Sequence, residues 1–318
     1  MSYEMQTAWG LSIAIYLFLG GLGAAVMGVV VITDMFRISN REHPTLVVWG
    51  AISSIIFLAV GSGMLFIHLL DHLAVLNVLN PLVLFTKPDA WIAWGTQFII
   101  WMMVWGFFYA CPYLRSAKGT RDMPLVGNGA KECGPVCKLM GLCQKYHRLI
   151  GWLTIINAVG TVAYTGLLLQ SFPAVALWHN PGLPMLFMVS AFSTALAFIL
   201  LLQYLVIKEP DQDLRRLFER IDLGLVGLEI ALVFFFVNYM LSGSESGLRS
   251  VEYLWNSWGW LLGFIGFGLI VPLMLEVGAV SGKLRGHLPV VVAAVLVLIG
   301  GFLLRHYTLM AGVYEYPW

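Results

Sequence analysis

Charged side chains are scarce in this sequence. Asp, Glu, Lys and Arg make up only 11% of its 318 residues, whereas 59% are hydrophobic and the mean hydropathy is +0.84. One water-soluble domain of this length cannot bury so much apolar surface, so membrane lipid must cover part of it. The net charge is only +1, whereas nucleic-acid-binding proteins carry a clear excess of basic residues. The composition predicts a polytopic membrane protein with no nucleic-acid partner.

Eight hydrophobic runs are long enough to cross about 30 Å of hydrocarbon as α-helices. The first run is too long for a cleaved signal peptide and lacks its positive leader, so we treat it as a true span. We predict an all-α membrane protein, a single polytopic domain over residues 1–318 that forms a bundle of eight transmembrane helices in two four-helix halves. The predicted spans are Trp9–Thr33, Leu46–Leu70, Trp91–Leu114, Leu149–Gln170, Leu183–Ile207, Leu223–Leu241, Leu254–Glu276 and Leu288–Leu304.

Basic residues are distributed unequally between the loops on the two sides of this bundle. The odd-numbered loops hold 15 Lys and Arg residues, and the other side holds three. Loops rich in Lys and Arg stay in the cytoplasm. We therefore expect the odd-numbered loops to be cytoplasmic and both termini to be external.

Cysteine is rare, and three of the four Cys lie in one long predicted cytoplasmic loop, residues 115–147. Thiolate and imidazole groups suit zinc or iron–sulfur centres, but the spacing here matches no standard pattern. Cytoplasmic cysteines also stay reduced, which argues against a disulfide. We expect free structural thiols and no metal site. The segment reads Cys133-x3-Cys137-x5-Cys143-x3-His147.

A second cytoplasmic segment, residues 208–221, carries apolar residues at helical spacing between arginines, from Leu214 to Ile221. This pattern predicts a short amphipathic helix on the inner membrane surface. The alternative is that its charges act only as a topology anchor.

Haem is the competing cofactor for a membrane redox protein, because b-type haems are held by His pairs from facing helices. Only His68 and His306 lie near spans on the same side. We expect no haem in this protein, and a single haem between these two residues is the alternative.

His68 and Asp71 stand one helical turn apart at the predicted external end of the second span. An ionisable group at mid-membrane costs about 2.5–3.5 kcal/mol, which makes such residues functional candidates. A quinol releases two protons with its two electrons, and a His beside a carboxylate can accept them. The alternative is that both residues simply meet water at the interface. Tyr164, in the external half of the fourth span, could then hold the opposite side of the same headgroup, or be structural.

Three further carboxylates suggest a proton route from the cytoplasmic side. Glu229 is the deepest, about seven residues into the sixth span, while Asp34 and Glu276 lie at the cytoplasmic ends of the first and seventh spans. A carboxylate at that depth needs a partner or a proton. The alternative is a protonated, hydrogen-bonded Glu229 and two water-exposed end carboxylates.

Seven short segments, in order along nearly the whole sequence, resemble the NrfD-like family. Its members are membrane subunits of complexes of the polysulfide reductase, dimethyl sulfoxide reductase and formate-linked nitrite reductase types. The segments are Ala14–Gly21, Ile67–Leu70, Ala163–Leu169, Asn180–Phe187, Gly227–Ile230, Gly268–Pro272 and Leu304–Tyr307.

The resemblance implies an eight-helix quinone-binding anchor in a prokaryotic inner membrane, with no haem or iron–sulfur cluster of its own. Such a subunit exchanges electrons between menaquinone or ubiquinone and a ferredoxin-like iron–sulfur subunit. That partner in turn serves a molybdopterin or multihaem cytochrome c catalytic subunit. The protein would position a cofactor that carries the redox chemistry itself.

The resemblance also assigns roles to individual residues. The family's His, Tyr and Glu of spans 2, 4 and 6 fall on His68, Tyr164 and Glu229. The start of span 1 is part of the family's quinone pocket, which assigns Trp9 and Tyr16 to quinone binding here. Two departures stand out. First, no His or Asn occupies Trp9 to Tyr16. Second, many relatives carry a basic residue shortly after the His of span 2, where this sequence has Asp71 and His72, and this could move the proton acceptor to Asp71.

Arg305, near the external end of the eighth span, is expected either to stabilise the quinone or to snorkel to the surface. The alternative for the whole protein is a proton-coupled secondary transporter. In that case the coupling groups would be Glu229, Asp34 and Glu276.

Overall fold

The computed structural model describes residues 3–7, 9–38, 43–68, 79–120, 134–207, 212–282, 284 and 286–315. Within that part of the sequence it contains eight helices long and apolar enough to cross a membrane, which confirms the predicted all-α membrane fold. Seven are α1 (Leu11–Met35), α2 (Pro44–His68), α5 (Trp91–Ala110), α7 (His147–Gln170), α8 (Leu183–Leu202), α9 (Gln212–Leu241) and α12 (Leu288–Met310). The remaining span joins the wide, π-helical segment η3 (Gly259–Ile270) to α11 (Val271–Val280).

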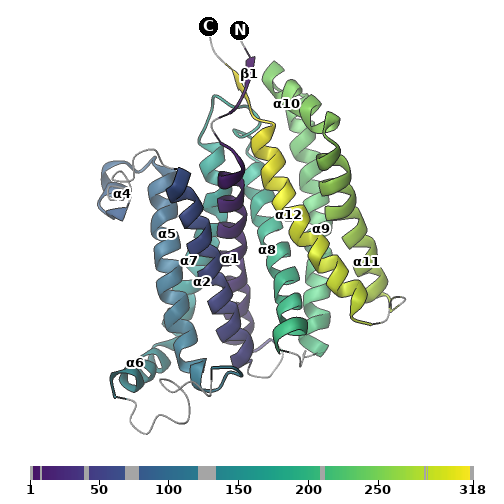
Figure 1. Cartoon of the computed structure of the whole chain (residues 1–318). Helices are drawn as coiled ribbons and strands as arrows, with labels where there is room; N and C mark the ends of the chain where they lie inside the picture. The colour runs from purple at the N-terminus through teal and green to yellow at the C-terminus, as the bar shows by residue number, and fades with distance from the viewer. Residues whose placement is uncertain are drawn as a thin grey trace.

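The spans pack in two groups that meet along α1 and α8 (Figure 1). Helices α2, α5 and α7 pack with α1, whereas α9, α11 and α12 lie on the side of α8. Small residues let α1 approach its neighbours closely. A Cβ at Gly23 would lie 3.0 Å from the Ser54 carbonyl oxygen of α2, and one at Gly28 would lie 3.1 Å from Ala158 of α7. The central position of α1 brings its side chains into contact with both groups.

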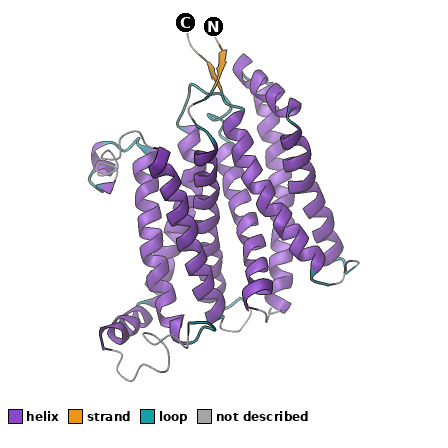
Figure 2. Ribbon diagram, in the orientation of Figure 1, coloured by secondary structure: helices purple, strands orange, loops and turns teal. Residues whose placement is uncertain are grey.

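Both termini lie at one end of the bundle, where β1 (Tyr3–Met5) pairs antiparallel with β2 (Val313–Glu315) (Figure 2). Gln6 strengthens this closure because its side-chain amide donates to the carbonyl oxygens of Trp9 and Leu309, at 2.9 and 3.0 Å. That this end faces the outside rests on the loop charges alone. We call it the terminal end, and the other the opposite end.

The structure changes some of the predicted boundaries. The seventh span begins at Gly259 instead of Leu254, because α10 (Glu245–Asn256) is a separate helix capped by Ser244, whose hydroxyl accepts a hydrogen bond from the Gly247 N–H at 3.3 Å. The predicted loop 115–147 contains a helix, α6 (Gly134–Lys145).

The predicted surface helix in residues 208–221 is not separate from the sixth span. From Gln212 onward the segment forms the first turns of α9. Its apolar residues Leu214 and Phe218 are buried against the bundle, which explains why the helix runs straight into the span. Short elements complete the description: η1 (Cys111–Arg115) extends α5, η2 (Gln203–Ile207) extends α8, and α4 (Val83–Thr86) lies in the loop before α5.

Candidate functional site

Two tyrosines meet in the half of the bundle nearer the termini. The hydroxyl of Tyr16 on α1 donates a hydrogen bond to the hydroxyl of Tyr164 on α7 across 3.0 Å, and both side chains are buried. The Tyr164 ring lies directly against the backbone of Gly95 on α5, where any Cβ would collide with it. The phenol pair is thus fixed by three helices.

Two cavities adjoin Tyr16. The larger, about 410 Å³, lies between α1, α2 and α5 and is lined mostly by apolar side chains, with Ser62 and Thr96 as its other polar residues. The smaller, about 250 Å³, lies nearer the terminal end and includes Trp9, Asp89 and Phe172. Tyr164 lines neither cavity, so it reaches them through Tyr16.

Trp9 closes the terminal end of the smaller cavity. Its ring stacks on Trp178 with 5.2 Å between ring centroids and meets the edge of Phe172 at 4.9 Å. Its backbone N–H donates to the side-chain oxygen of Gln6 at 2.9 Å. The indole N–H of Trp178 in turn donates to the carbonyl oxygen of Thr308 at 2.8 Å. Sequence reasoning named Trp9, Tyr16 and Tyr164 separately, and the structure brings them together around these two cavities.

His68 is the last residue of α2, and the described structure does not extend to its side chain. Leu65 and Phe66, just before it, line the larger cavity, so the end of α2 borders that cavity. Asp71 and His72 lie outside the described residues.

Arg305 is fully buried, which contradicts the expectation that it snorkels to the surface. It donates to the hydroxyl of Ser190 at 3.2 Å and to the carbonyl oxygens of Gly301 and Phe187 at 2.6 and 3.2 Å. It lines neither of the two cavities. It also interacts electrostatically with Glu229, whose carboxyl hydrogen-bonds Ser190.

Two further buried acidic residues, Asp222 and Glu276, lie between Glu229 and the opposite end of the bundle. Asp222 accepts a hydrogen bond from Ser193 at 2.7 Å, shares a hydrogen bond with Glu276 on α11, and interacts electrostatically with Glu229. Sequence reasoning missed Asp222, because the predicted sixth span began one residue after it. Its spacing of seven residues from Glu229, two helical turns, could have found it, since both then share one face of a helix.

Asp34 belongs to a different cluster at the opposite end. Tyr109 and Tyr113 donate to its carboxylate at 2.6 and 2.7 Å, and His147 Nε2 lies 3.6 Å from the same oxygen. The His147 ring also stacks on Tyr109 at 4.2 Å. The predicted proton-route carboxylates therefore divide: Glu229 and Glu276 share a polar group, whereas Asp34 lies in the other half of the bundle.

Cys111 and Cys143 are free, buried and in contact with each other, and burial raises the pKa of the Cys143 thiol on α6. Cys133 and the Cys137 side chain lie outside what the structure describes. Among the described residues no group of three or more His, Cys, Asp or Glu could hold a metal ion.

The fold and the buried polar groups define a multi-pass integral membrane protein with a cavity system inside one half of its bundle. The family described as "Polysulphide reductase, NrfD" matches residues 2–316, and the chain belongs to that family. Membership makes it the membrane-anchor subunit of a respiratory oxidoreductase.

Named relatives agree with this family. The sequence is 30% identical to Protein NrfD of Escherichia coli K12 and 27% identical to a polysulfide reductase polypeptide of Wolinella succinogenes. It is 22% identical to the NrfD homolog of Haemophilus influenzae. Each match covers 96% of this sequence and 94% of the relative, so the likeness extends over the whole membrane domain.

Proposed function

We propose that this protein exchanges electrons between the membrane quinone pool and a peripheral iron–sulfur subunit, with the quinone headgroup bound beside Tyr16. The observation that carries the proposal is the phenol pair of Tyr16 and Tyr164 at the junction of two cavities. Menaquinone or ubiquinone supplies the two-electron, two-proton chemistry when bound.

The larger cavity fits such a headgroup in size and chemistry. Ligand cavities commonly measure about 300–1,000 Å³ and combine apolar walls with a few polar groups that fix orientation. The cavity of about 410 Å³ has that composition, with Tyr16, Ser62 and Thr96 among apolar side chains. Thr96 already donates to the carbonyl oxygen of Ile92 at 2.8 Å, so the hydroxyls of Tyr16 and Ser62 are the other hydrogen-bonding groups in this cavity.

The phenol pair can serve both redox states of the ligand. A hydroxyl group donates one hydrogen bond and accepts others. With Tyr16 donating to Tyr164, as in the structure, the Tyr16 oxygen can accept a hydrogen bond from a hydroxyl group in the cavity. If both O–H bonds rotate, Tyr164 donates to Tyr16, and Tyr16 can donate to a carbonyl. In this arrangement Tyr16 contacts the quinone directly, and Tyr164 determines whether Tyr16 donates or accepts the hydrogen bond to it.

Proton release belongs at the same end of the bundle. His68 and Asp71 are the proposed acceptors, since the end of α2 borders the larger cavity. Asp89, which lines the smaller cavity, is a second candidate carboxylate. Each of these acceptors would pass its proton to the water at the terminal end.

The assignment to this family supports a partnership with other subunits of a reductase complex. The relative from Wolinella succinogenes is, by its name, one of several polypeptides of polysulfide reductase. We propose that a ferredoxin-like iron–sulfur subunit docks at the terminal end, nearest the cavities, and serves a molybdopterin or multihaem cytochrome c catalytic subunit. The complex would lie in a prokaryotic inner membrane with both termini external.

A proton route through the second half of the bundle is a separate part of the proposal. Arg305, Ser190, Glu229, Asp222 and Glu276 form a connected polar series across α8, α9, α11 and α12. The same series is what a proton-coupled transporter would use. Substrate-dependent uptake by this protein alone in vesicles would favour that alternative.

The central test is quinol-dependent electron transfer in the assembled complex. Tyr16→Phe should lower turnover strongly, and Tyr164→Phe should lower it less, because the second hydroxyl acts through the first. Tyr239→Phe, an exposed tyrosine on α9, is the matched control. Normal turnover and normal binding of a quinone-site inhibitor in both Tyr16→Phe and Tyr164→Phe would remove the phenol pair from the site.

A further inference from the structure

A third cavity, of about 440 Å³, lies at the opposite end of the bundle and takes no part in the site described above. Its lining comes from the first turns of α9 on one side and from residues between and beside α11 and α12 on the other. Figure 1 shows these helix ends at the end of the bundle away from the termini. Three arginines of α9, Arg215, Arg216 and Arg220, line it, together with one carboxylate, Glu219. The lining therefore carries an excess of positive charge.

Glu219 is already neutralised. The Nε of Arg215 lies 3.0 Å from its carboxylate, and the Nη1 of the same guanidinium donates to the Tyr204 hydroxyl at 2.7 Å. Arg216 and Arg220 are exposed and make no hydrogen bond or ion pair within the described residues, although Arg216 also interacts electrostatically with Glu219. They are four residues apart and so lie on one face of α9, one turn apart. Two guanidinium groups thus line the cavity without a hydrogen-bonded anion.

The opposite wall is compatible with an anion. Its turn folds back on α11 through a hydrogen bond from the Leu284 N–H to the Gly278 carbonyl oxygen at 3.0 Å. Val290, in the first turn of the 23-residue helix α12, also lines the cavity. The N-terminus of a long helix carries partial positive charge from its free N–H groups. Both walls therefore favour a negatively charged group.

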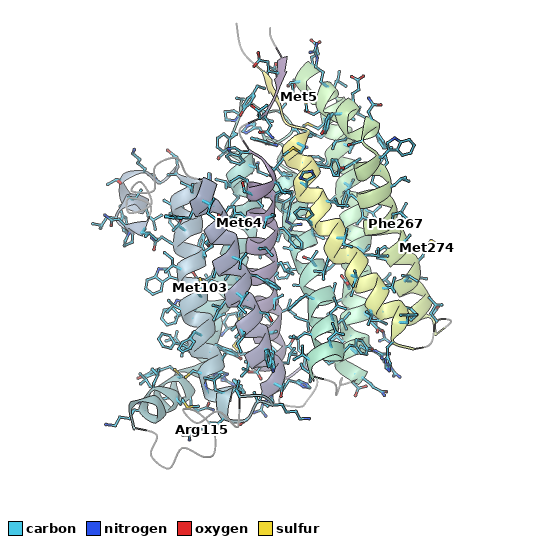
Figure 3. All side chains as sticks on the ribbon, viewed as in Figure 1. Met5, Met64, Met103, Arg115, Phe267 and Met274 are labelled. Carbon is cyan, nitrogen blue, oxygen red and sulfur yellow. The ribbon has the colours of Figure 1, made fainter. Side chains whose placement is uncertain are left out.

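The cavity also continues into a surface suited to acyl chains. Val280 lines it. Val277 and Met274 of α11 and Ile270, the last residue of η3, follow at intervals of three or four residues, all with exposed side chains. Figure 3 shows Met274 on the outer edge of α11, pointing away from the bundle. This lipid stripe (Ile270, Met274, Val277 and Val280) leads directly from the cavity along the membrane-facing side. A free phosphate ion would make no use of it.

We propose that this cavity binds the phosphodiester headgroup of an anionic phospholipid between Arg216 and Arg220, with the acyl chains along the lipid stripe. Basic pockets between membrane helices at the cytoplasmic side favour such headgroups. The guanidinium groups bind phosphate oxygens with charge-assisted hydrogen bonds. This lipid site is independent of the quinone site, which lies at the other end of the bundle.

The experiment measures lipid binding to the purified full-length protein, with its partner subunits where they co-purify, by native mass spectrometry in detergent. Phosphatidylglycerol should bind more tightly than phosphatidylcholine. Replacing both Arg216→Gln and Arg220→Gln should weaken phosphatidylglycerol binding roughly tenfold or more, with little change for phosphatidylcholine. The matched control removes two exposed positive charges elsewhere at the same end, Lys145→Gln and Arg148→Gln, and should bind as the parent does.

Three outcomes would overturn the proposal. The first is equal binding of the two lipids by the parent protein, and the second is equal loss in the double variant and in its control. The third is displacement of phosphatidylglycerol by inorganic phosphate, which would assign the cavity to a free anion. A single Arg220→Gln variant provides an independent measurement if the double variant is poorly folded, and it should weaken phosphatidylglycerol binding by a smaller factor.

Discussion

Ser190 on α8 accepts a hydrogen bond from the guanidinium of Arg305 on α12 at 3.2 Å and hydrogen-bonds the carboxyl of Glu229 on α9. One small hydroxyl thereby joins a buried cation to a buried carboxylate and holds three helices together. Phe18 and Phe187 lie beside the guanidinium, with their ring centroids 5.7 and 5.2 Å from its carbon. Arg305 and Glu229 interact electrostatically inside the bundle, so we treat them as a buried pair of opposite charge.

Removing one member of this pair should be more harmful than removing both. Arg305→Leu leaves Glu229 without its counter-charge, and breaking a buried pair typically costs about 3–5 kcal/mol of stability. The double variant Arg305→Leu with Glu229→Leu should recover much of that loss, because neither charge remains. Thermal unfolding of the purified protein in detergent measures both effects.

The control for this comparison is the pair of Arg249 and Glu245 on α10, 3.1 Å apart with both side chains largely exposed. Exposed pairs contribute about 1 kcal/mol or less, so Arg249→Gln should change the unfolding temperature little. If Arg305→Leu were no more harmful than Arg249→Gln, Arg305 and Glu229 would not be a stabilising pair.

Gly95 should be indispensable to the phenol pair. The Cβ of Gly95→Ala would collide with the Tyr164 ring, and overpacking of this kind costs about 1–3 kcal/mol. The displaced ring should also lose its hydrogen bond to Tyr16, so quinol-dependent turnover should fall together with stability. Gly224→Ala on α9 is the matched control, since a Cβ there meets nothing within 4 Å. Identical behaviour of the two variants would show that Tyr164 can move without consequence.

The spans could be predicted from the sequence because a run of about 20 apolar residues is a local property. The pairing of Tyr16 with Tyr164 could not, because the two residues are 148 positions apart and meet only when α1 packs on α7. Gly95 had no visible role for the same reason. Its importance comes from a ring carried by another helix.

Snorkelling was one of two expectations for Arg305, because it directly follows Leu304, the end of the predicted eighth span, where a long side chain could reach water. Its hydrogen-bond partners Ser190 and Phe187 belong to another helix, so no sequence pattern within α12 predicts them. Asp222 was missed for a different reason: an acidic residue at the edge of an apolar run is typical of the start of a span. Only the tertiary structure shows that this edge is covered by α8 and α11.

The two carboxylate clusters should respond differently in a proton-uptake measurement on the complex in liposomes. Asp222→Asn interrupts the series between Glu229 and Glu276, so it should slow any uptake through the second half of the bundle. Asp34→Asn should leave that uptake unchanged, because Asp34 is bound by Tyr109 and Tyr113 in the first half. Slow uptake in Asp34→Asn and normal uptake in Asp222→Asn would reverse the assignment.

Cys143 should react slowly with a maleimide, with a dependence on pH set by its burial. Only the thiolate reacts, and burial raises the pKa of the Cys143 thiol above its ordinary value. At neutral pH the thiolate fraction is therefore smaller than that of an exposed cysteine. The rate should still be rising with pH where an exposed thiol has levelled off. The comparison uses two variants with a single cysteine each, Cys143 itself and Leu142→Cys, whose parent side chain is 55% exposed. Coincident rate profiles for the two positions would mean that α6 does not bury Cys143.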